Sequence, residues 1–317
     1  MKYTEYSLLD GAIRIPELIK HIKDFQMTSV AITDHGWMAG VINFYKECAK
    51  NDVKPILGCE IYVTENEDNL ENEFKIRDNE HIVLLAKDNI GYSKLLETVS
   101  TAALNNFYYK PRVWKEHLKK LAGHVIVASA CLGSPIAKRL EFIKDEDDIV
   151  VGYIDPEDKA RREIEYYLNI FNKDFYLELQ VWDDGKHHQK VYNEYLLKVG
   201  KELGAQFVLT TDAHFLNKED YVLHELLMAM QFKMTIENYR QKSVMQYGPY
   251  FYVANSEEML SRAKFLHCES AFYNTQIIAD QCNVELTLGK YQEPTFDITQ
   301  ADDYQDYLIW KEKNESI

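Results

Sequence analysis

The chain has 317 residues, of which 46% are apolar, so it can bury the core of one large domain or of two smaller ones. Its net charge of −15 at pH 7 argues against a domain that grips DNA unaided, because such domains are usually basic. The sequence has no apolar run of about 18 residues, which a membrane-spanning helix needs, and its first residues lack the apolar stretch of a signal peptide.

The cysteines follow no regular spacing and form no Cys-x-x-Cys motif. They stand at positions 48, 59, 131, 268 and 282. A disulfide framework normally shows ordered spacing, so this scatter indicates thiols in a reducing compartment. We therefore expect a cytoplasmic protein.

Strand-like apolar runs alternate with helix-like segments from the amino terminus to about Leu288. The strand-like runs are 29–36, 54–63, 80–88, 124–133, 174–182 and 205–214, and helical spacing is found at 13–22, 45–49, 91–104, 158–171 and 189–203. This alternation predicts an α/β fold around a parallel sheet, open or closed into a barrel. It predicts one domain over 1–288, and a linker with one short helix over 289–317.

The segment 207–214 ends an apolar strand on Asp212 and His214. Side chains two residues apart in a strand point to the same side, so these two would face one place. Sites in parallel sheets gather at the carboxyl ends of strands, and an Asp–His pair there suits a divalent metal. The alternative is a solvated loop in which Asp212 caps the following helix.

Similar polar residues stand near the ends of the other apolar runs. They are Asp10, Asp34, His35, Glu60, His81 and Cys131. Each has an ordinary explanation by itself, as a turn, a helix cap, a surface residue or a small core residue. Together they would suit two or three divalent ions, with the thiolate favouring zinc and the carboxylates accepting manganese or magnesium.

Several motifs follow one another in an order that identifies a family. They include YSLLDGAIRI, AITDHGWMAG, FYYKPRV, SACLGSPIAKRL and TTDAHFLNKEDYVLHELLMAM. From residue 4 to about 290 the chain resembles the N-terminal polymerase-and-histidinol-phosphatase (PHP) domain of bacterial DNA polymerase III alpha subunits. The resemblance implies a distorted (β/α)7 barrel with a short C-terminal extension, and a part in DNA replication within a nucleotidyltransferase. Residues 294–308 resemble the start of the polymerase region, but the palm with its catalytic aspartates is absent from this sequence.

The resemblance also implies a ligand set. The matching positions are Asp10, His35, Glu60, His81, Cys131, Asp212 and His214, with Asp34 expected to support the ligands rather than touch a metal. The family's leading His-x-His pair falls on Met1 and Tyr3, so two of its nine ligands are missing here. Either the site is partly lost or Met1 is not the true start.

In the family's arrangement Glu60, His81 and Cys131 hold one ion, and Asp10, His35 and His214 hold another. The ion that the missing pair shares with Glu60 and Asp212 would be poorly held. We therefore expect one or two bound divalent ions, which would be zinc, manganese or magnesium, singly or in combination.

A metal centre of this kind hydrolyses phosphodiesters through metal-bound water, so no side chain is assigned as the catalytic group. The resemblance implies a metal-dependent phosphoesterase or 3′–5′ exonuclease acting on DNA 3′ ends. Its expected partners are DNA, the remainder of a polymerase and other replisome subunits, and no membrane. Two alternatives stay open: a catalytically silent structural module of a split or truncated polymerase, and a free-standing phosphatase.

The motif FYYKPRV carries two further candidates for contact with a nucleic acid. Lys110 and Arg112 could contact a phosphate, and Tyr108 and Tyr109 could stack on a base. The more common roles are a solvated basic pair and core aromatic residues.

Overall fold

A computed structural model describes residues 2–65, 79–242, 248–291 and 304–314 of the chain. The chain divides into two units, Met1–Val284 and Glu285–Ile317, and the second contains helix α11 (Tyr304–Asn314). No helix in the described ranges combines the length and the hydropathy that a membrane span requires.

The first unit is built on a curled sheet of eight strands within the described residues. The strands are β1 (Ser29–Ile32), β2 (Lys54–Thr64), β3 (Glu80–Ala86), β4 (Phe107–Tyr108), β5 (Lys110–Trp114), β6 (Val125–Ala128), β9 (Phe175–Gln180) and β10 (Gln206–Thr210). Their order is β10-β9-β6-β3-β2-β5-β4, and β1 also pairs with β2. A separate hairpin joins β7 (Glu141–Lys144) to β8 (Val150–Ile154).

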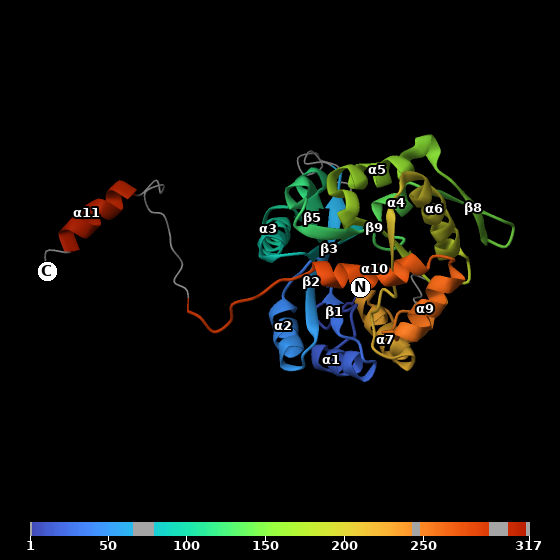
Figure 1. Cartoon of the computed structure of the whole chain (residues 1–317), viewed down its shortest axis with the longest axis horizontal. Coiled ribbons are helices and arrows are strands. Elements are labelled where there is room, and N and C mark those ends of the chain that lie inside the picture. Colours follow the sequence, from blue (N-terminus) through green and yellow to red (C-terminus); the bar gives the residue numbers. More distant parts are fainter. Residues whose placement is uncertain (1, 66–78, 243–247, 292–303, 315–317) are drawn as a thin grey trace. The chain divides into compact units, whose positions relative to one another are not determined.

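Helices surround this sheet, as Figure 1 shows for α1, α2, α3, α5 and α6. The α-helices of the first unit are α1 (Ile15–Asp24), α2 (Val41–Lys50), α3 (Asn89–Asn105), α4 (Pro135–Lys138), α5 (Lys159–Phe171), α6 (His188–Leu203), α7 (Tyr221–Gln231), α8 (Ile236–Lys242), α9 (Ser256–Phe265) and α10 (Glu269–Gln281). The predicted α/β class and the barrel-like arrangement are confirmed.

Hydrophobic spacing explains why these segments adopt their structures. In α1 the apolar residues Ile15, Leu18, Ile19 and Ile22 fall on one face at helical intervals, and all four are buried. In contrast, every residue of β6 is buried, as expected for a strand covered on both faces.

The prediction of a parallel sheet is wrong for β3, which runs antiparallel to both β2 and β6. Parallel neighbours need a crossover, usually a helix, and no helical spacing separates the runs that became β2 and β3. Because β3 is reversed, its first residues lie where the parallel strands end. His81, near the start of β3, is therefore brought opposite Tyr62, near the end of β2.

Helix α10 closes the other end of the curled sheet. Its residues Ile278 and Ala279 pack in one buried cluster with Ile56, Leu85 and Ile126, which lie at the start of β2, the end of β3 and the start of β6. The predicted metal ligands lie at the opposite end of the sheet, away from this cluster.

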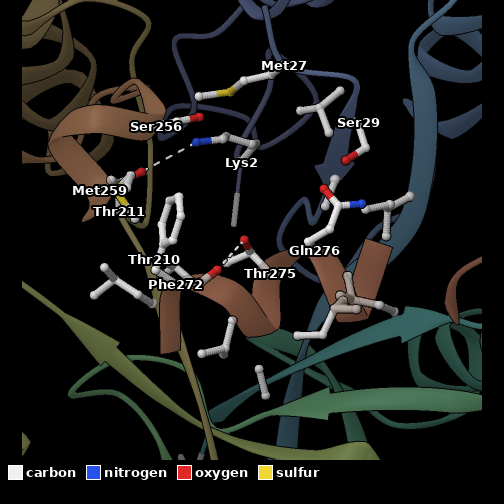
Figure 2. A pocket seen from close by; sticks show the side chains of 18 of the residues that line it. Lys2, Met27, Ser29, Thr210, Thr211, Ser256, Met259, Phe272, Thr275 and Gln276 are labelled. Atoms are coloured by element: carbon white, nitrogen blue, oxygen red, sulfur yellow. Dashed lines mark hydrogen bonds between the residues drawn. The ribbon is translucent and has the colours of Figure 1, made fainter. Parts of the chain in front are cut away.

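Residues 2–4 join the two sides of the curled sheet at the end where the predicted metal ligands lie, called the ligand end below. The backbone of Lys2 accepts a hydrogen bond from Thr33 N–H, and Tyr3 N–H donates to Ala213 O at 3.0 Å. Below this junction a cavity of about 400 Å³ lies between β1 and β10. In Figure 2 Lys2 stands at one end of the cavity, bonded to Thr211, and Phe272 of α10 projects into it.

Glu178 of β9 lines this cavity and is completely buried. Its Oε1 atom accepts hydrogen bonds from Thr210 and, at 3.0 Å, from Gln180, whereas Oε2 has no partner among the described residues. Burial, reinforced by the Asp212 carboxylate, raises the pKa of Glu178 to about 7. The fold therefore favours the neutral acid.

We expect Glu178→Gln to stabilise the protein at pH 8 by up to about 3 kcal/mol, and to have little effect at pH 5. An acid whose pKa is raised on folding contributes full stability below its unfolded value of 4.5 and loses it as the pH rises through 7. Glutamine keeps the shape and the acceptor atom without the charge. Urea unfolding at both pH values in metal-free buffer measures the difference, with the exposed Glu17→Gln as a control. An equal effect of Glu178→Gln at both pH values would contradict this account.

Candidate metal centre

The structure brings Asp10, His35 and His214 together at the end of the sheet opposite α10. One potential ligand atom from each residue lies within 4.8 Å of the others. His35 Nε2 is 2.9 Å from Asp10 Oδ2, and His214 Nε2 is 3.7 Å from Asp10 Oδ1. Two imidazoles and a carboxylate at this separation are a common ligand set for a divalent metal ion.

Sharp backbone turns place these side chains. Leu9, which precedes Asp10, and Ala130, which precedes Cys131, both have φ of 62°, and Asp212 has φ of 50°. Left-handed conformations cost free energy in residues other than glycine and persist where the surrounding structure requires them. Gly36, which follows His35, adopts φ of 65° without that cost. Each of these turns redirects the chain at a candidate ligand.

Glu60 joins this group to His81. Its carboxylate is fully buried, with Oε1 3.0 Å from His35 Nδ1 and 2.8 Å from His81 Nδ1. Burial alone would raise the pKa of Glu60, but the two imidazoles hold it well below its usual range. His35 consequently lies between the carboxylates of Glu60 and Asp10, which together outweigh burial and raise its pKa to about 10.

Cys131 and Asp212 face the same region from the loops that follow β6 and β10. The Cys131 sulfur accepts a hydrogen bond from Gly133 N–H, and His81 packs directly against Gly133. Burial, together with the Asp212 and Glu60 carboxylates, raises the pKa of the Cys131 thiol. Asp212 Oδ1 is buried and has no hydrogen-bond partner among the described residues. A cation would satisfy this oxygen and favour the thiolate, so the donor set fits a metal.

The predicted second group, Glu60 with His81 and Cys131, is only partly assembled. Glu60 and His81 are in contact, but within the described ranges only Asp10, His35 and His214 bring three ligand atoms within the distance given above. Asp34 has a different environment, because its buried carboxylate accepts hydrogen bonds from Thr4 and Ser7. It fixes the loop that leads to Asp10.

His224 was not predicted from the sequence. It lies on α7, is 2% exposed, and places Nε2 3.5 Å from Asp10 Oδ1. Its ring centroid is 5.3 Å from that of His214. The sequence offered one signal for His224: it stands four residues before Met228, so the two share a face of the helix. That spacing is also typical of a histidine in the core.

A family model described as "PHP domain" matches residues 3–181. The chain belongs to the PHP domain family. It is 35% identical over 312 residues to DNA polymerase III subunit alpha of Deinococcus radiodurans, covering 95% of this chain and 22% of that protein. The corresponding subunit of Borreliella burgdorferi is 34% identical over 284 residues, covering 89% and 23%. The chain thus spans about a quarter of the length of the curated relatives it matches.

Among solved structures the likeness is distant. An amidohydrolase from Chromobacterium violaceum, with bound sulfate and no metal, aligns with a TM-score of 0.37 and 12% identity, covering 65% of this chain and 84% of that one. A candidate metal-dependent phosphoesterase from Bifidobacterium adolescentis aligns with a TM-score of 0.39 and 14% identity over the same shares of the two chains.

Tyr3 is the residue on which the resemblance places one histidine of the family's leading pair; Met1 lies outside the described residues. The tyrosine is 1% exposed, and its ring stacks on His35 with centroids 4.1 Å apart and contacts His214 at 4.4 Å. Its hydroxyl donates a hydrogen bond to Glu60 Oε2. The Tyr3 hydroxyl therefore binds one of the candidate ligands, Glu60.

The two basic residues of FYYKPRV have different environments. Arg112 is 1% exposed and its guanidinium lies 5.2 Å from the Tyr108 ring, so it offers a phosphate much less surface than Lys110 does, and its predicted phosphate contact stays a prediction. It is held in the core by packing against the aromatic residue. Lys110 is partly exposed, and its Nζ lies 5.0 Å from the Tyr62 ring, beside the metal centre.

We expect the purified PHP domain to retain one or two divalent ions per chain, with zinc among them, in elemental analysis after growth with zinc and manganese. His214→Ala should lower the count and the thermal stability, because bound metal contributes to folding. His124→Ala is the control, since that half-exposed histidine pairs with Asp88 away from the site. A wild-type chain that stays metal-free on titration would contradict the assignment.

Proposed function

We propose that this PHP domain is the N-terminal module of a cytoplasmic replicative polymerase of the DNA polymerase III alpha type, and that it is a metal-dependent phosphoesterase with a weakened site. Its substrate would be the 3′ end of single-stranded DNA. The observation that carries the proposal is the convergence of Asp10, His35 and His214 within 4.8 Å. The similarity to alpha subunits extends over 95% of the chain in one relative, which favours the polymerase branch over a free-standing phosphatase.

Asp10, His35 and His214 would hold the ion, which when bound polarises the phosphoryl oxygens and lowers the pKa of water. In the metal-free chain His35 carries a proton between Asp10 and Glu60, and the proton on Nε2 has to leave before this nitrogen can become a ligand. The bond from Nδ1 to Glu60 then fixes the orientation of the ring.

Tyr3 weakens the site on the Glu60 side. Its hydroxyl competes for a carboxylate oxygen that a second ion would need, and its ring fills space between His35 and His214. An acidic chain also needs a bound cation close to the substrate phosphate, because its net charge of −15 repels DNA. The same tyrosine favours the second candidate function, a catalytically silent module that supports the polymerase.

Restoring the missing ligands tests the proposal. We expect Tyr3→His, with a second histidine at the position of Met1 behind a new initiator, to raise metal occupancy. Manganese-dependent release of nucleotides from single-stranded DNA 3′ ends should rise at least about tenfold, the usual scale for groups that support metal ligands. Tyr3→Phe removes the hydroxyl without adding a ligand. Comparing its activity with that of Tyr3→His therefore separates the effect of freeing the Glu60 carboxylate from the effect of adding an imidazole ligand.

Glu60→Ala in both backgrounds is the control for contaminating nucleases. Digestion by the unmodified chain that Glu60→Ala abolishes would show that the site works without the pair. If the variant with the added histidines gains metal but releases no nucleotide, the phosphoesterase proposal is wrong and the catalytically silent module is the better explanation.

A further inference from the structure

We propose that the turn Tyr109–Lys110 is a binding subsite for the last nucleotides of a DNA single strand, with Lys110 on a phosphate and Tyr109 stacked on a base. This inference rests on the proposed function, since it names how the same site receives its substrate. It concerns a hairpin, β4–β5, that contributes no candidate metal ligand.

The hairpin is docked on the loop that carries His35. A Cβ atom on Gly36 would lie 2.8 Å from Pro111 Cγ and 3.0 Å from the Tyr62 ring, so only glycine allows this close approach. Gly36 N–H also donates to Glu60 O, which ties the same loop to β2. The position of the hairpin is therefore fixed relative to His35 and Glu60.

Lys110 projects from this hairpin toward the metal centre. Its Nζ lies 5.0 Å from the Tyr62 ring, and that ring is 5.2 Å from His81 and 6.3 Å from His35. The ammonium group is thus separated from two candidate ligands by a single aromatic ring. A phosphate bound at the metal centre would lie within reach of a flexible lysine placed there.

Lys110 also differs from other basic residues of this region in its charge environment. Lys115 is 2.7 Å from Glu163, and Arg139 pairs with Glu80. Within the described residues, in contrast, Lys110 has no carboxylate at ion-pair distance. In a chain of charge −15, an ammonium with no ion pair to a described carboxylate, beside the candidate ligands, is a local attraction for an anion.

Tyr109 is the single turn residue between Tyr108 and Lys110, which pair with each other across the hairpin. It has φ of 61° and is 60% exposed. Glycine would adopt this conformation without strain, so a large exposed aromatic residue here is costly for the fold. Its ring rests edge-on against Tyr108 at 4.7 Å, and Tyr108 in turn packs on Arg112. The exposed ring is thereby held in place beside Lys110.

An exposed aromatic ring next to an unneutralised lysine is the arrangement that binds single-stranded nucleic acid without base specificity. Stacking accepts any base, and the lysine recognises the backbone. The metal centre would then receive the terminal phosphodiester of a strand anchored at the turn. A free nucleotide has the same chemistry, but it lacks the neighbouring phosphate that a strand supplies.

Binding is tested separately from hydrolysis, with the full chain in manganese and a 5′-fluorescein oligothymidylate whose 3′-terminal linkages are phosphorothioates. We expect Lys110→Ala and Tyr109→Gly each to raise the Kd about tenfold, measured by anisotropy. Lys110→Ala should also lower the slope of log K against log salt by about 0.7, the value for one phosphate contact on a single strand. Lys110→Arg and Tyr109→Phe should keep most of the affinity, and thymidine monophosphate should compete weakly.

Two controls separate binding from structure and from overall charge. Tyr109→Gly relieves the strained turn, so its thermal stability should be equal to or above wild type while its binding falls. Lys50→Ala removes an equally charged but exposed lysine at the end of α2, before the start of β2 and away from the ligand end, and should change little. Metal content should stay unchanged in all these variants.

The inference is overturned if Lys110→Ala and Tyr109→Gly bind like wild type, if Lys50→Ala weakens binding equally, or if wild type binds no strand. Strand binding that needs Tyr109 and Lys110, in a chain that never hydrolyses DNA, would instead overturn the proposed function alone. Hydrolysis with normal KM in both variants would overturn the inference alone.

Discussion

The candidate site depends on the hydrogen bonds that the buried carboxylate of Glu60 makes with its neighbours. A charge removed from water is tolerated only when donors surround it, and here Tyr3, His35 and His81 provide them. Glu60 lies on β2, the strand that pairs with β1, β3 and β5. The three donors come from three separate segments of the chain. One carboxylate therefore orients the amino-terminal segment, the loop after β1 and the start of β3 toward a common centre.

Much of this arrangement could be predicted from the sequence. Apolar spacing predicted most of the principal strands and helices close to their observed positions, because burial of hydrophobic residues largely decides local structure. The ends of the apolar runs pointed to Asp10, His35 and His214, which the structure brings together. The pattern of apolar runs placed His81 near a strand start, the resemblance made it a candidate ligand, and the antiparallel direction of β3 explains its position.

Other features could not be predicted because they depend on tertiary contacts. Arg112 looked like a surface cation, but packing against Tyr108 places it in the core. His224 looked like one residue of an amphipathic helix, and only the position of α7 brings it to Asp10. The resemblance placed a family histidine at the position of Tyr3. It could not show that the hydroxyl would bind Glu60, since that contact joins residues far apart in the chain.

The cavity between β1 and β10 has a consequence for motion. Backbone hydrogen bonds of Lys2 and Tyr3 join the chain just after these two strands at the ligand end. Away from that end, the two strands face each other across the cavity through side chains. Backbone amides next to such a gap open to solvent more readily than those of β6, which lies between β3 and β9. Hydrogen exchange in β1 and β10 will therefore be faster than in β6. Because His35 and His214 follow those two strands, we expect their separation to vary with the width of the gap.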